Sequence, residues 1–67
     1  MGDANQRALL REILRLLIRE REDAQLLYIP RGEAGMRRMI ASLLALRTPN
    51  ENDAQLSALL AQLGDQS

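Results

Sequence analysis

The sequence lacks the side chains on which many small catalytic or metal-stabilised domains depend. Its 67 residues include no Cys, His, Trp or Phe, and the single aromatic residue is Tyr28. Disulfide bridges, Cys/His zinc sites, cysteine nucleophiles and histidine general bases are therefore excluded. A chain of this length has room for one domain only.

The sequence also lacks net charge and long apolar runs. Nine Arg balance nine Asp and Glu, and there is no Lys. The chain as a whole therefore has no electrostatic attraction to nucleic acid or to an anionic membrane. Arg11, Glu12 and Arg15 interrupt the longest apolar region. We expect no transmembrane segment, no secretory signal and a cytoplasmic protein.

Leucine and alanine are abundant instead. Leu occurs 14 times and Ala nine times, whereas Val is absent and Ile occurs four times. This composition favours helix over sheet. The spacing of the apolar residues predicts an all-α fold. We expect residues 1–67 to form a small three-helix domain, with helices at about 3–27, 33–47 and 53–63.

Four residues set the expected helix boundaries. Asp3 is a suitable N-cap for the first helix. Pro30 and Pro49 disfavour helical geometry in the residues before them, so the first two helices should end there. Gly64 has the conformational freedom that the C′ position of the third helix often uses.

The first predicted helix is apolar over an unusually wide arc of about 200°, roughly twice what packing on one core requires. Either two elements wrap it, or an apolar strip is left for a partner. At 1.5 Å per residue the three helices would span about 37, 22 and 16 Å, so the short pair could not cover the long one. The stability of a domain with so small a core is also marginal without disulfides, a structural metal or a partner chain. We therefore expect homodimerisation, with five residues in the joint interface: Leu9, Leu10, Ile13, Leu16 and Leu17.

Arginines recur every four residues along the first predicted helix and form what we call the arginine stripe: Arg7, Arg11, Arg15 and Arg19. One interpretation is a clamp for phosphate or carboxylate groups. The other is a solvent-exposed face on which the arginines form ion pairs with acidic residues three or four positions away, such as Glu12 and Glu22. Since no aromatic residue interleaves the stripe for base stacking, the solvated face is the preferred interpretation.

No other pattern indicates catalysis. The carboxylates show no arrangement typical of a general acid and base pair, and the segment Arg31–Gly35 lacks the Gly-Lys-Ser/Thr ending of a phosphate loop. Tyr28 is expected to pack at the edge of the core with its hydroxyl in water. We predict no enzyme activity, no catalytic residue, no cofactor and no metal.

The stretch from Arg19 to Leu63 resembles a known region. It is similar, in order and with little gapping, to the short helical region that precedes the macrodomain in bacterial zinc-dependent protein-ADP-ribose hydrolases. The matching pieces are Arg19-Glu20-Arg21-Glu22-Asp23, Leu27-Tyr28-Ile29-Pro30, Leu43-Leu44-Ala45-Leu46-Arg47-Thr48-Pro49 and Asn52-Asp53-Ala54-Gln55-Leu56.

The departures from that region matter. The family's Asn is Ala45 here, Thr48 interrupts its Arg-Pro pair, and the macrodomain itself is missing. The resemblance therefore implies a helical fold and a docking role, without hydrolase activity and without any transferable catalytic residue. Arg47 is the one matching polar position that the resemblance marks as a possible contact.

These observations predict a non-catalytic helical interaction or accessory module. The expected partner is a second copy of the chain or another protein, for which the resemblance implies a macrodomain of an ADP-ribosylation system. No membrane partner is expected. The alternative is a small nucleic-acid-binding protein that uses the arginine stripe.

Overall fold

A computed structural model describes residues 2–65 of the chain, with side chains for residues 4–64. It confirms a small all-α, three-helix fold. The elements are α1 (Gly2–Arg19), a 3-10 turn η1 (Ala24–Leu26), α2 (Glu33–Leu46) and α3 (Asp53–Asp65). The second and third helices match the predicted ranges to within two residues at each end.

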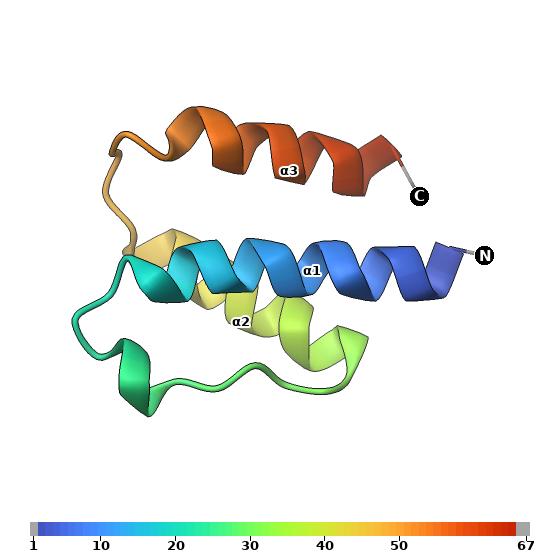
Figure 1. Ribbon diagram of the computed structural model, residues 1–67, viewed down its shortest axis with the longest axis horizontal. Helices are drawn as coiled ribbons and strands as arrows, with labels where there is room; N and C mark the ends of the chain where they lie inside the picture. Colours follow the sequence, from blue (N-terminus) through green and yellow to red (C-terminus); the bar gives the residue numbers. More distant parts are fainter. Residues whose placement is uncertain (1, 66–67) are drawn as a thin grey trace.

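Helix α1 lies between the other two helices. Figure 1 shows α2 and α3 packed on different sides of α1, with α2 running in the same direction as α1 and α3 running in the opposite direction. The connection between α1 and α2 carries the chain back along the molecule, which lets these two helices run in the same direction. The resulting body measures 35 × 25 × 15 Å.

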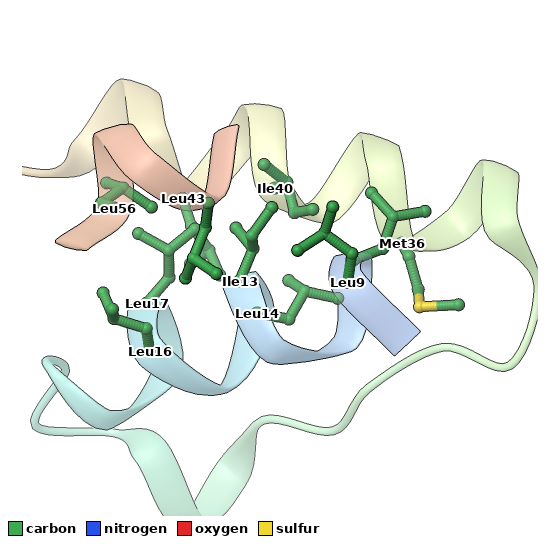
Figure 2. Close-up of a cluster of buried hydrophobic side chains, with 11 residues drawn as sticks. Leu9, Ile13, Leu14, Leu16, Leu17, Met36, Ile40, Leu43 and Leu56 are labelled. Atoms are coloured by element: carbon green, nitrogen blue, oxygen red, sulfur yellow. The ribbon is translucent and has the colours of Figure 1, made fainter. Parts of the chain in front are cut away.

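The core is built around α1. Its most deeply buried side chains are Leu10, Ile13 and Leu14 of α1 and Met36 of α2, all at 0% exposure. Figure 2 shows Ile13 and leucines of α1 meeting α2, with Leu56 of α3 lying beside Leu43 of α2. Two helices thus share the wide apolar arc of α1.

The predicted dimer interface is wrong for this structure. All five of its side chains are buried inside a single chain: Leu9, Leu10, Ile13, Leu16 and Leu17. The reason is length. Helix α1 has 18 residues, whereas α2 and α3 have 14 and 13. At 1.5 Å per residue these helices span about 27, 21 and 20 Å, so the short pair covers the long one.

Helix α1 ends eight residues earlier than predicted. It stops at Arg19, and the backbone N–H of Arg21 closes the last turn on the carbonyl of Ile18 at 3.0 Å. Residues 19–23 contain no apolar side chain, so continuing the helix would bury nothing, and tertiary burial supplies most helix stability in proteins. A single 3-10 turn, with the N–H of Leu26 bonded to the carbonyl of Asp23 at 2.9 Å, follows instead.

Two further end details differ from expectation. Gly64 lies inside α3, and none of the glycines in residues 2–65 has a positive φ, so the predicted C′ role of Gly64 is wrong. The predicted cap Asp3 has its side chain outside the described ones, and α1 already begins at Gly2.

The start of α2 is fixed by a close approach to the preceding segment. A Cβ added to Gly35 would lie 2.9 Å from the Cβ of Pro30, closer than ordinary packing allows. The absence of a side chain at Gly35 therefore lets the extended segment before α2 lie directly against its first turn.

None of the helices in the described part of the chain combines the length and the hydrophobicity that a membrane crossing requires.

Candidate functional site

The ends of the helices meet at one end of the molecule, where polar side chains connect them. Helices α1 and α2 finish there and α3 begins there (Figure 1). We call the polar cluster the Glu20 network; it consists of Glu20, Arg47, Asn50, Asn52 and Asp53. Glu20 directly follows α1, whereas the other members lie between α2 and α3 or begin α3. The network therefore joins all three helices.

The carboxylate of Glu20 accepts four hydrogen bonds. Arg47 donates Nε to Oε1 at 2.8 Å and Nη2 to Oε2 at 3.2 Å. Asn50 and Asn52 each donate their amide Nδ2 to Oε2 at 2.9 Å. The side chains of Arg47 and Glu20 are only 12% and 14% exposed. Charge-assisted, bidentate hydrogen bonds between Arg and a carboxylate are among the strongest polar contacts in proteins.

Arg47 also holds the start of α3. Its Nη1 lies 2.7 Å from Oδ1 of Asp53, and its Nη2 donates to Oδ1 of Asn50 at 2.8 Å. Asp53 in turn accepts the backbone N–H of Asn50 at 3.1 Å. The placement also suits the helix dipoles, because Arg47 lies where α1 and α2 end and Asp53 lies at the N-terminus of α3.

These contacts determine how the acids ionise. The Arg47 hydrogen bond, reinforced by those from Asn52 and Asn50, lowers the pKa of Glu20 to about 2. The pKa of Asp53 is lowered as well, first by the backbone N–H of Asn50 and then by Arg47. Glu20 is therefore ionised throughout the neutral range and cannot serve as a proton donor there. The network is suited to holding the helices together, not to acid catalysis.

Arg47 therefore has a structural role, since its guanidinium pairs with Glu20 and Asp53. It was singled out as a possible polar contact, and the structure directs it to partners within the chain. Glu20 is not among the predicted site residues, because it stands in a run of five charged residues, Arg19 to Asp23, in which nothing local distinguishes one carboxylate from another. One feature of the sequence could have located it: the run contains no apolar residue, which indicates that the first helix ends there, and Glu20 would then lie at a helix end.

The arginine stripe is exposed along α1: Arg7, Arg11, Arg15 and Arg19. Within the side chains described, residues 4–64, none of the four makes an ion pair or a side-chain hydrogen bond. The expected ion pairs with Glu12 and Glu22 are therefore not found among these side chains.

An apolar groove lies beside the second half of α1. We call it the Tyr28 groove; it has a volume of about 460 Å³ and is lined by Arg15, Ile18, Arg19, Leu27, Tyr28 and Ile29. Tyr28 is 79% exposed, so the prediction that it packs at the core edge is wrong. Tyr28 lines this groove together with two arginines of the stripe, which lie nine or more positions before it in the sequence.

A larger cleft of about 700 Å³ lies on the side of the Glu20 network that faces α2. Most of its charged groups are satisfied internally, since Arg47 pairs with Glu20 and Arg21 pairs with Asp23 at 2.8 Å. It therefore offers a ligand few free charges.

Among the described residues, no group of three or more potential ligands is arranged to hold a metal ion. No family model, curated protein or solved structure matches the chain.

Proposed function

We propose that this protein is a non-catalytic helical module that binds another protein chain through η1 and the residues that directly follow it, 24–29. One observation carries the proposal: Leu26 and Tyr28 are 77% and 79% exposed, although the chain closes its own core. Single exposed apolar side chains are ordinary on protein surfaces. Here, however, Tyr28 lines the Tyr28 groove together with half-buried Leu27 and Ile29, so apolar side chains that follow one another in the chain share one accessible surface.

The residue types support the same conclusion. Binding energy at protein interfaces concentrates in Tyr, Trp and Arg side chains that water leaves on association. The Tyr28 groove combines Tyr28 with Arg15 and Arg19, and neither arginine has a carboxylate partner within residues 4–64. A rigid support is also present, because the Glu20 network fixes the helix ends next to the exposed segment.

Two partners are proposed. The first is a second copy of the chain, which would make the module homodimeric through a surface other than the core leucines. The second is a macrodomain of an ADP-ribosylation system, for which the resemblance of residues 19–63 is the support. Both can be measured directly with the purified protein.

The test has two arms. Light scattering over protein concentrations from about 10 µM to about 1 mM detects self-association down to weak affinity. Calorimetric titration with a bacterial zinc-dependent macrodomain that lacks its helical leader detects the accessory role. The matched variants are Tyr28→Ser, which should weaken any association, and Leu46→Ser, which alters an exposed side chain outside the Tyr28 groove. No association in either arm removes the proposal.

A nucleic-acid-binding protein is the second candidate. The observation that favours it is that Tyr28 lines the same groove as Arg15 and Arg19, since single-stranded bases stack on aromatic rings in positively charged grooves. Binding of a labelled single-stranded oligonucleotide should then fall steeply with salt and should be lost in Arg15→Ala/Arg19→Ala. Absence of binding at low salt eliminates this candidate.

A further inference from the structure

We propose that the Tyr28 groove receives Leu26 and Glu22 of a second copy of the chain, in a two-fold symmetric dimer. The inference rests on the proposed interaction function and specifies its partner and its contacts. The exposed segment of each copy would be both the inserted element and part of the receiving surface.

The lining of the groove defines what fits it. Four of its residues are apolar or aromatic, two are arginines, and no carboxylate is among them. Elsewhere on the surface, Arg21 and Arg37 pair with carboxylates of this chain, at 2.8 and 3.2 Å. Arg15 and Arg19 have no such partner among the described side chains. A suitable occupant therefore brings an apolar side chain for the groove and a carboxylate for its rim.

The chain presents one segment with that chemistry in its described part. Leu26 is exposed and does not line the Tyr28 groove of its own chain. Glu22, four residues earlier, is exposed and makes no ion pair or hydrogen bond with residues 4–64. The other strongly exposed aliphatic residue, Leu46, lies beside Arg47 and Glu20, whose charges already satisfy each other.

Symmetry makes this arrangement self-consistent. Residues 22–26 immediately precede the groove residues 27–29 in the chain, so one two-fold axis can bring each inserted segment to the groove of the other copy. Each copy then offers two arginines to Glu22 of its neighbour, and the association adds no net charge. The surface is small compared with the roughly 1,200 Å² or more of a stable interface, so we expect a reversible dimer that forms at high protein concentration.

A charge exchange between copies tests the proposal. Arg19→Glu alone and Glu22→Arg alone each place like charges across the proposed contact, and each should raise the dimer dissociation constant by about tenfold or more. In an equimolar mixture the two variants regain opposite charges at both symmetric contacts. The mixture should therefore dimerise like the wild type in light scattering, and only as the mixed species in native mass spectrometry.

Two controls keep the test independent of folding. Helicity measured by circular dichroism should be unchanged in both variants, because both positions are on the surface. The matched exchange Arg38→Glu with Glu51→Arg alters exposed charges outside the groove, and it should leave the dissociation constant of each variant at the wild-type value.

Several outcomes would overturn the inference. A wild-type chain that stays monomeric at about 1 mM overturns the proposed dimer. In that case the titration with a macrodomain still tests the proposed interaction function separately. The inference is also overturned if the chain dimerises but neither Tyr28→Ser nor the charge exchange changes the dissociation constant, because association then uses another surface. Oligonucleotide binding that is lost in Arg19→Glu, without self-association of the wild type, would assign the groove to nucleic acid.

Discussion

Glu20 and Arg47, 27 positions apart in sequence, form a two-pronged ion pair with Nε–Oε1 and Nη2–Oε2 distances of 2.8 and 3.2 Å. The pair connects the residue after α1 to the residue after α2. Because Arg47 also contacts Asp53, one guanidinium links the ends of two helices to the start of the third. The stability of the domain should depend on this contact more than on any other surface charge.

We expect Glu20→Gln to destabilise the fold by about 2 kcal/mol, since it removes charge-assisted bonds and leaves a shielded guanidinium with one carboxylate fewer. For a domain of this size that corresponds to a fall in the melting temperature of about 10 °C. The matched control is Glu22→Gln, which removes an exposed carboxylate with no partner among residues 4–64. Equal melting temperatures for the two variants, measured by circular dichroism, would contradict the role of the network.

The same contact predicts a pH dependence. The pKa of Glu20 falls from 4.5 to about 2 on folding, so its contribution is complete above about pH 4.5 and disappears as the pH falls toward 2. Urea unfolding of the wild type and of Glu20→Gln should therefore show a stability difference that is constant near neutrality and shrinks between pH 4.5 and 2. Comparing the two proteins removes the parallel effect of Asp23, whose pKa is also lowered. The pKa of Asp53 responds in part to the charge of Glu20, so Asp53 adds a smaller change to the difference. A difference that grows in acid would refute the prediction.

Gly35→Ala should destabilise the protein, although alanine is the better helix former by about 1 kcal/mol. The added methyl group would meet the Cβ of Pro30 at 2.9 Å, and the strain of displacing that segment should exceed the gain in propensity, for a net loss of about 1 kcal/mol. Gly64→Ala is the control, because nothing lies within 4 Å of its added Cβ. Chemical denaturation should show a loss for the first variant and none for the second; a gain at Gly35 would mean that the segment yields without cost.

Ile13→Asp should unfold the chain. Ile13 is completely buried between helices, and a carboxylate there would have no partner, at a cost of several kcal/mol that exceeds what a domain of this size can tolerate. Leu46→Asp makes the same chemical change at a side chain that is 68% exposed, and it should retain its helicity. A folded Ile13→Asp monomer would show that the core is assigned to the wrong residues.

The sequence was informative where a helix has a regular apolar period and a clear end. The spacing of Leu56, Leu59, Leu60 and Leu63 located α3, and Pro49 located the end of α2 to within one residue. Periodicity succeeds there because each helix buries one face against a single neighbour, α1.

The site was less predictable because it depends on contacts between distant residues. Arg47 stood out by its position, but its partner Glu20 is 27 residues away, and nothing local distinguishes Glu20 from the neighbouring Glu22. The wide apolar arc of α1 allows two explanations, wrapping by two elements or a strip for a partner, and the structure has two helices that divide the arc between them. An arc on one helix gives the amount of surface to be covered and does not identify what covers it.

Helix α1 begins, and α3 finishes, at the end of the molecule opposite the segment that carries Leu26 and Tyr28 (Figure 1). A fluorophore, an affinity handle or a linker to a sensor chip can therefore be attached at either extremity without shadowing that segment. Immobilised protein would therefore keep Leu26 and Tyr28 accessible to a partner in solution, whichever extremity is used for coupling.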